Sequence, residues 1–329
     1  MSTRPPVFKM FRSAFAGGVI LITLLCMAPM NVVRLRHLSE YAVHVMFFWL
    51  ACSLVFLAFR REKMMWVTLL AAAVLAVFLR ERGNQQPVTP VAATNRSTLS
   101  IGLYNTVNFD TLQSTFLRGL KHHSDDLVAI QEVDPYWLGL LRDSLAEKYP
   151  YQLAVNDLGT YGMLLLSTNP LSRTDSFWVA GSPVLAGEVD VPGFPLPLRF
   201  VTTYIPPLLN TRSLEQQQLV LDSLSNYCAG INRPLVVFGA FNAVTWSAEL
   251  NAFLDQTLLR DSRHGLGAYT PDDRISPFEI QRDHILHSAH LARTGFKAVD
   301  FTVGNRHSGF VGTYQFVNTL EDETATGEL

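Results

Sequence analysis

Long apolar runs are concentrated before residue 80 of the chain. Three runs without Asp, Glu, Lys or Arg occupy Ala14–Val33, Tyr41–Phe59 and Met64–Leu79. A helix that crosses a bilayer needs about 20 apolar residues; the first two runs reach about this length and the third is slightly short. We therefore predict three transmembrane helices within residues 1–82. A buried helical hairpin is the alternative, whereas a cleaved signal peptide would have only one such run.

The cations around these runs predict how the helices are oriented. Short loops on the cytoplasmic side of a membrane carry an excess of Lys and Arg. After an odd number of crossings, the two ends of the segment lie on opposite sides. The counts therefore predict a cytoplasmic N-terminus and an extracytoplasmic C-terminal part, which in a bacterium is periplasmic, attached to the inner membrane. The cytoplasmic set is Arg4, Lys9, Arg12, Arg60, Arg61 and Lys63, and the opposite set is Arg34, Arg36, Arg80 and Arg82.

The pattern changes after the apolar runs. Residues 83–98 are polar, contain two prolines and are typical of a linker. From residue 99 short buried strands alternate with amphipathic helices, which predicts an α/β domain over residues 99–316 and an acidic tail over residues 317–329. The predicted strands are residues 99–105, 126–133, 162–168, 198–205, 234–241, 282–288, 295–303 and 308–316; the predicted helices are residues 110–122, 136–148, 211–227 and 247–254.

Composition narrows the function classes. Only 16% of the residues are charged, against about 25% in a typical soluble domain, which agrees with a membrane part plus a soluble part. The net charge of −2 does not favour a binder of polyanions. Cys26 and Cys52 fall in apolar runs and Cys228 stands alone, so the cysteines can form neither a disulfide framework nor a zinc site.

Polar motifs stand at or just after the predicted strand ends. Their order and spacing resemble the endonuclease/exonuclease/phosphatase superfamily, with its DNase I-like fold, and most of all a bacterial branch with three N-terminal membrane segments. The resemblance covers residues 99–316 and implies a four-layered α/β sandwich. The motifs are Asn105, Gln131-Glu132-Val133, Gly162–Ser167, Thr202–Pro206, Gly239-Ala240-Phe241-Asn242, Asp283-His284-Ile285 and Asn305-Arg306-His307.

The resemblance implies metal-assisted hydrolysis of a phosphoester, with Mg²⁺ as the expected cofactor. Such a reaction needs a hard cation, donors to the phosphate oxygens and a group that deprotonates water. The resemblance assigns Glu132 as the metal ligand and Asn105 as a supporting polar contact. It places Tyr204 against the phosphate and lets Asn242 orient the phosphate or the nucleophile.

The last motif and its partner complete the implied site. His307 would bind a phosphate oxygen, and Asp283 would hold the His307 ring in the proper tautomer. Two positions depart from the family pattern, because Ala240 and Arg306 stand where the family has aspartates. The first aspartate is the family's water-activating base and the second helps to hold the metal. General-base catalysis is worth roughly 10²–10⁴ in rate, and an arginine opposes cation binding.

We therefore expect Mg²⁺ to bind weakly or not at all, and the domain to be a pseudoenzyme that acts as a binding or scaffold module. The alternative is an atypical metal-dependent phosphodiesterase or phosphatase whose base is His284, Tyr204 or His307. Purely structural roles are the alternative for three of these residues. Glu132 could form a structural salt bridge with Arg306, and His284 and its neighbour Asp283 could cap a strand and fill a core.

The expected partners are the membrane itself and a phosphate-containing ligand or a protein of the cell envelope. Nucleic acid is not supported. The segment Trp178–Pro197, where a substrate-specifying region is expected, is short and rich in Gly and Pro, without the basic and aromatic interleaving of nucleic-acid grooves. The clusters Arg260-Asp261 and Asp272-Asp273-Arg274 are expected to be solvated loops.

Overall fold

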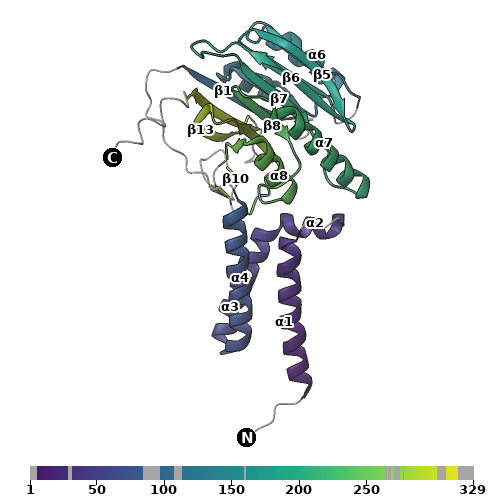
Figure 1. The fold of residues 1–329 in the computed structure, drawn as a ribbon, viewed down its shortest axis with the longest axis vertical. Helices are drawn as coiled ribbons and strands as arrows, with labels where there is room; N and C mark the ends of the chain where they lie inside the picture. The colour runs from purple at the N-terminus through teal and green to yellow at the C-terminus, as the bar shows by residue number, and fades with distance from the viewer. Residues whose placement is uncertain are drawn as a thin grey trace, which may run out of the picture.

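The structure is a computed structural model of the chain. It consists of a bundle of apolar helices and an α/β domain at one end of that bundle (Figure 1). The N-terminus lies at the opposite end of the bundle from the domain. The residues that the structure describes are 6–28, 32–83, 97–106, 113–158, 161–263, 265, 268–269, 275–276, 278–301 and 309–317.

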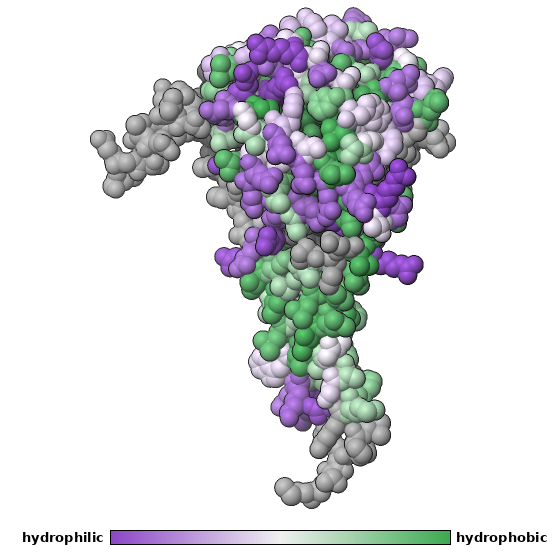
Figure 2. All heavy atoms as spheres, turned by 45° about the vertical axis from the view of Figure 1, so that its right-hand side comes forward, coloured by the Kyte–Doolittle hydropathy of each residue, from purple (hydrophilic) through white to green (hydrophobic). Residues whose placement is uncertain are grey.

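The bundle contains α1 (Pro6–Met27), α3 (Ala42–Ala58) and α4 (Glu62–Arg82). Of the described helices, α1 and α4 are each long and apolar enough to cross a membrane. A third span forms if α3 is combined with the short helix α2 (Val33–Glu40), from which it is bent by 65°. Figure 2 shows that hydrophobic residues cover the bundle, whereas the domain above it is largely hydrophilic.

The helix α2 was not predicted, because the first apolar run continued to Val33. The structure ends α1 at Met27 and begins α2 at Val33. Pro29 and Asn31, which lie between the two helices in the sequence, are residue types that favour a helix end. The predicted cations Arg34 and Arg36 therefore belong to a helix at the domain end of the bundle, and not to a simple loop.

The domain contains two six-stranded sheets, which we call sheet A and sheet B. Sheet A has the strand order β13-β14-β1-β2-β4-β3, and sheet B has the order β5-β6-β7-β8-β12-β9. Each sheet has one parallel pair near its middle, β1 with β2 and β7 with β8, and a helix connects each pair. The strands are β1 (Thr98–Asn105), β2 (Leu127–Gln131), β3 (Tyr151–Val155), β4 (Met163–Ser167), β5 (Leu171–Val179), β6 (Ser182–Val189), β7 (Leu198–Tyr204), β8 (Leu235–Ala240), β9 (Arg260–Asp261), β12 (Asp283–His287), β13 (Leu291–Val299) and β14 (Gly309–Phe316), with β10 (Ala268–Tyr269) and β11 (Ile275–Ser276) as a separate pair.

Three apolar cores hold the layers together. The central core lies between the sheets and contains side chains from both, such as Leu165 and Phe238. The other face of sheet A packs on α5 (Gln113–His122) and α6 (Pro135–Leu145). The other face of sheet B packs on α7 (Thr211–Ala229) and α8 (Ala248–Thr257). The arrangement is a four-layered α/β sandwich, so the predicted fold class is confirmed.

One strand of this domain was not predicted, and the prediction of a solvated loop at Arg260-Asp261 was wrong. The segment Trp178–Pro197 contains the whole of the buried strand β6, which pairs with the edge strand β5. Pro183 and Gly187 are residue types that are uncommon in strands, and β6 was not among the predicted strands, although all eight of its residues are buried. The pair Arg260-Asp261 forms the edge strand β9, and Asp261 is buried. Short edge strands carry too few residues to show an alternating pattern.

The domain boundaries stay predictions. The strand β1 begins at Thr98 and β14 ends at Phe316. Most of the predicted linker 83–98 and of the acidic tail 317–329 lies outside the described residues.

Candidate functional site

The parallel strands of both sheets end at one edge of the sandwich. Asn105 ends β1, Glu132 follows β2, and Tyr204 ends β7. In sheet B, Ala240 pairs with Tyr204 on one side and with Asp283 on the other. We call this group of five residues the strand-end site. It meets the expectation that parallel strands bring their carboxyl ends to the same edge.

Glu132 is held by donors from both sheets. Its carboxylate accepts a hydrogen bond from Asn105 Nδ2, with 2.6 Å between the nitrogen and Oε1. The hydroxyl of Tyr204, from sheet B, also donates to Glu132. The backbone of Glu132 has φ +59°, a left-handed conformation that few non-glycine residues adopt and that often marks a functional site. The turn therefore points this carboxylate at the junction of the two sheets.

The surroundings of the site raise the pKa of two of its groups, Glu132 and Tyr204. Burial is the main cause of the raised pKa of Glu132, and the negative charge of Asp283 adds to it, while the Asn105 and Tyr204 hydrogen bonds oppose it. Burial, together with Glu132 and Asp283, also raises the pKa of Tyr204. Tyr204 is therefore a protonated phenol at neutral pH, which suits a hydrogen-bond donor and not a general base.

Ala240 stands at the end of β8, with its side chain in the core between the sheets. Its backbone N–H donates to Gln131 Oε1 at 2.8 Å, and Gln131 Nε2 donates to the carbonyl of Thr203 at 2.7 Å. Gln131 thus joins sheet A to both strands of the parallel pair of sheet B. The neighbouring Gly239 allows this close approach, because a Cβ there would lie 2.0 Å from the Thr203 oxygen.

Asn242 lies in the loop after β8, with φ +48°. Its Nδ2 donates to the carbonyl of Ile205 at 2.7 Å, and its own carbonyl accepts from Gln217 Nε2 at 3.0 Å. Its backbone N–H donates to Arg282 at 3.0 Å. The side chain therefore fixes the loop after β7 to the loop after β8. Its predicted role in orienting a phosphate is not tested by these contacts.

The sequence of the endonuclease/exonuclease/phosphatase family matches residues 107–309 of this chain. The chain belongs to this family. The match extends over both sheets and includes every residue of the strand-end site except Asn105, which lies two residues before it.

Solved structures support the fold. A family protein from Beutenbergia cavernae superposes with a TM-score of 0.55 at 15% identity, covering 67% of this chain and 72% of that one. The human Nocturnin catalytic domain with bound sulfate gives 0.54 at 16% identity, with 67% and 94% covered. The mannosyl-6-phosphatase Bt3783 from Bacteroides thetaiotaomicron gives 0.51 at 17% identity, with 67% and 100% covered. These identities establish the fold alone. No curated protein matches the sequence significantly.

Family members usually depend on a metal, so the donors of the site were compared with that requirement. Among the described residues no group of three or more His, Cys, Asp or Glu side chains could hold a metal ion. The carboxylates of Glu132 and Asp283 and the amide of Asn105 would hold a metal at this site, but Ala240 supplies no ligand where the family pattern has an aspartate. Mg²⁺ is usually bound by one or two carboxylates and keeps several waters, so these donors fit it with one carboxylate fewer than the family pattern.

The remaining predicted site residues divide into two groups. His307 and Arg306 lie outside the described residues, so the predicted pairing of His307 with Asp283 and of Arg306 with Glu132 stays untested. Asp283 is half-buried at the start of β12 and close enough to Glu132 to influence its pKa. Asp283 therefore lies at the strand-end site.

His284 has a structural role. It is 1% exposed; its Nδ1 lies 2.8 Å from Asp261 Oδ2 and its Nε2 lies 2.8 Å from the carbonyl of Ala243. Burial alone would raise the pKa of Asp261, but the charge and hydrogen bond of His284 outweigh it, and the pKa of Asp261 is lowered. Both ring nitrogens of His284 are engaged, so it is no candidate for the base, and the core-filling interpretation holds.

The sequence analysis missed Gln131, although its motif was recognised. Gln131 is a polar residue at the end of a buried, otherwise apolar strand, and this break in the apolar pattern could have indicated a role for its side chain. It also missed Arg36 and Glu40, which are buried on α2 and contact the domain. Their spacing of four residues places them on one face of a short helix, but only the domain explains their burial.

Proposed function

We propose that this chain is a membrane-anchored member of its family whose strand-end site binds a phosphate-containing ligand of the cell envelope, or an envelope protein, with catalysis impaired. Nucleic acid is not the ligand that we propose. The observation that carries the proposal is Ala240. Its methyl group faces the space between the sheets beside Tyr204, so no carboxylate is available there to activate water.

The donors that remain suit binding. Asn105 and Tyr204 present N–H and O–H groups at the same point, where Glu132 accepts them and where a phosphate oxygen would replace it as the acceptor. Donors fixed by a rigid scaffold can hold phosphate oxygens without any step of bond cleavage. We expect a pocket that binds an oxyanion. This pocket has the geometry of the family's site but lacks the family's base.

The second candidate is an atypical metal-dependent phosphodiesterase or phosphatase, which needs a replacement base. Of the three residues considered, His284 has both ring nitrogens occupied and Tyr204 has a raised pKa. His307 is the remaining candidate, and it lies outside the described residues. These contacts favour the impaired enzyme over the active one.

Metal binding tests the proposal on the full-length protein in detergent. The wild type should bind Mg²⁺ or Mn²⁺ weakly in calorimetry and hydrolyse a generic phosphodiester at background rates. Ala240→Asp with Arg306→Asp should bind the metal at least about tenfold more tightly, because one carboxylate 4 Å from a cation contributes about 4 kcal/mol per unit charge even at an effective dielectric near 20. Turnover should recover later than binding, because it also depends on substrate fit.

The matched control is Ala146→Asp, which adds a carboxylate at an exposed position after α6. It should leave metal binding unchanged. Micromolar binding of Mg²⁺ by the wild type, together with metal-dependent hydrolysis, would mean that the site is catalytic. Substitution of His307 would then be the next experiment.

We further propose that the domain lies on the periplasmic side of a bacterial inner membrane. Arg12, Arg60, Arg61 and Lys63 gather at the end of the bundle far from the domain, as expected for a cytoplasmic end. A reporter fused after Leu329 should be active as alkaline phosphatase and dark as ordinary fluorescent protein. A fusion truncated after Arg61 should show the opposite pair, and the reverse pattern at both sites would overturn this orientation.

A further inference from the structure

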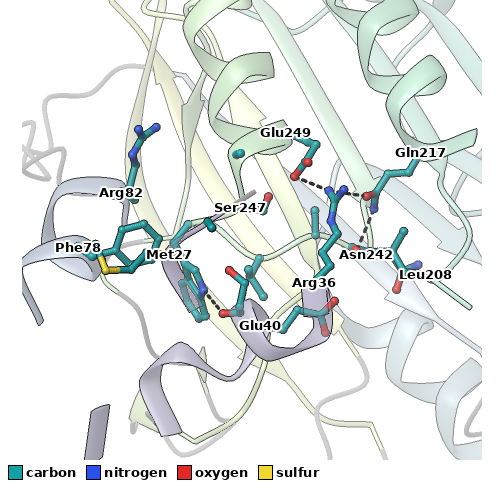
Figure 3. A pocket seen from close by; sticks show the side chains of 16 residues that line it. Met27, Arg36, Glu40, Phe78, Arg82, Leu208, Gln217, Asn242, Ser247 and Glu249 are labelled. Atoms are coloured by element: carbon teal, nitrogen blue, oxygen red, sulfur yellow. Dashed lines mark hydrogen bonds and ion pairs between the residues drawn. The ribbon is translucent and has the colours of Figure 1, made fainter. Parts of the chain in front are cut away.

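A cavity of about 110 Å³ lies where the bundle meets the domain, separate from the group around Glu132. Figure 3 shows this cavity from close by, with side chains from the bundle on one side and from the domain on the other. We call it the junction pocket. Its lining includes Met27, Arg36, Phe78, Arg82, Leu208 and Trp246.

The junction pocket lies at the level where a bilayer would end. Met27 is the last residue of α1 and Arg82 is the last residue of α4, the two helices with the length and composition of membrane spans. Met27 on α1 and Phe78 on α4 add apolar side chains to the pocket, whereas Arg36 on α2, Arg82 on α4 and Glu249 of the domain add charged ones. A lining with both apolar and charged side chains fits a molecule that has an apolar part and a charged part.

Arg36 supplies a donor that has no acceptor. The residue is 7% exposed, its guanidinium forms an ion pair with Glu249, and its Nη2 donates to Gln217 at 3.1 Å. Its Nη1 is buried and has no hydrogen-bond partner among the described residues. Leaving a buried charged donor unpaired destabilises a protein, so an acceptor that enters the pocket would be stabilising.

The charges around the pocket favour an anionic acceptor. The carboxylate of Glu249 already faces Arg36, and Glu40 accepts a hydrogen bond from Arg282 Nη2 at 2.5 Å. Arg82 adds an exposed cation on the other side. With both acids already facing cations, the donors that remain belong to guanidinium groups, which match the oxygens of a phosphate.

We propose that the junction pocket binds the phosphate of a phospholipid headgroup, with Arg36 and Arg82 as its donors and with Met27 and Phe78 against the glycerol and the first acyl carbons. The site does not depend on whether the strand-end site is catalytic. The two are connected, because Asn242 lines the junction pocket and its carbonyl accepts from the same Gln217 that Arg36 contacts.

The test uses the full-length protein, stripped of lipid in a maltoside detergent. Three probes are titrated and followed by calorimetry and native mass spectrometry: a short-chain phosphatidylglycerol, a diacylglycerol of the same chain length, and glycerol 3-phosphate. The phosphatidylglycerol should bind with one molecule per chain and at least about tenfold more tightly than either of the other probes. Arg82→Gln should weaken this binding about tenfold or more, as should Arg36→Gln.

Neighbouring cations provide the controls. Arg34 on α2 and Arg80 on α4 are exposed and do not line the pocket, so Arg34→Gln and Arg80→Gln should bind the lipid like the wild type. Because Arg36→Gln leaves Glu249 without its cation, the double variant Arg36→Gln/Glu249→Gln removes the pair together and guards against loss of folding.

Each contrary result overturns the inference in its own way. Unchanged lipid affinity in both Arg82→Gln and the double variant would exclude the junction pocket as the phosphate site. An affinity for glycerol 3-phosphate equal to that for phosphatidylglycerol would indicate that the ligand is a soluble phosphate ester. An equal affinity for diacylglycerol would show that the pocket recognises the apolar part of the lipid and not its phosphate. An equal loss of affinity in Arg34→Gln and Arg80→Gln would reduce the effect to general surface charge.

Discussion

The two sheets contribute differently to the strand-end site. On the side of sheet A, polar side chains contact one another: Asn105 donates to Glu132. On the side of sheet B, Tyr204 also donates to Glu132, whereas Asn242 bonds to the carbonyl of Ile205 and His284 lies against that of Ala243. Polar groups that are committed to backbone carbonyls serve the scaffold. Sheet A therefore supplies the carboxylate of Glu132, and sheet B supplies one donor to it together with side chains that hold its own loops.

Breaking the scaffold of sheet B should have the largest effect. His284→Ala removes the ion pair of the buried Asp261 carboxylate, which keeps only its contacts with Arg263, and should lower the free energy of unfolding by about 3–5 kcal/mol. Replacing both residues, in Asp261→Leu/His284→Leu, should recover only part of the loss, because the charge of Arg263, which is 2% exposed, stays buried. Thermal unfolding in detergent measures both. Stability unchanged in His284→Ala would show that His284 is not structural and would make it a candidate base again.

The second largest effect on stability is expected when the link that Gln131 makes between the sheets is removed. Gln131→Ala removes the acceptor of the Ala240 N–H and the donor to Thr203, and should lower the free energy of unfolding by about 2–4 kcal/mol. Gln152 is the matched control, since its Nε2 also donates to two carbonyls, but at a partly exposed position. Gln152→Ala should lower stability by less than about 1 kcal/mol. Equal losses in the two variants would mean that Gln131 does not join the sheets.

The smallest expected effect is a pH-dependent change in melting temperature when Glu132, the carboxyl group of sheet A, is replaced. The pKa of Glu132 is raised above its ordinary value of 4.5, so its contribution to stability is present below that pH and is lost as the pH rises through the folded-state pKa. Glu132→Gln should therefore melt at a higher temperature than the wild type at neutral pH, because the glutamine carries no charge to be buried. The difference should vanish below pH 4.5.

The control for this pH dependence is Glu215→Gln, at an exposed position on α7. Its melting temperature should follow that of the wild type at every pH. A wild type that is more stable than Glu132→Gln at neutral pH would show that the hydrogen bonds from Asn105 and Tyr204 outweigh burial.

The sequence predicted the parts of the site that depend on local pattern. Asn105 and Glu132 follow buried apolar strands whose pattern is visible in the chain, and the order of the strand-end motifs then indicated the fold. The bridging role of Gln131 and the structural role of His284 were not predictable. Both depend on which residues of a distant strand or loop meet them, such as Ala240 and Asp261, and no local pattern contains that information.

For the apolar helices, too, the features that depend on local pattern were predictable and those that depend on distant contacts were not. Apolar runs predicted both ends of α3 and α4 to within three residues, because length and hydrophobicity define such helices, whereas α1 begins eight residues before the first run and ends six residues before its end. The helix α2 was missed because its residues are polar and its burial depends on the domain. A buried arginine and a buried glutamate, Arg36 and Glu40, would be unexpected on a free interfacial helix.

The 65° bend between α2 and α3 has a consequence for how the protein encounters its ligands. One eight-residue helix contacts the loops that follow β7 and β8 and the residue before β12, so the domain cannot swing on a flexible tether. With the bundle in a bilayer, as we propose, the strand-end site is carried at one height above the membrane and faces one direction. A lipid-borne ligand would then be found by lateral diffusion in two dimensions, while a soluble one would have to reach the narrow layer of water next to the membrane. The contacts that fix this geometry are Arg36 with Gln217 and Glu249, His37 with Leu208, Ser39 with Trp246, and Glu40 with Arg282.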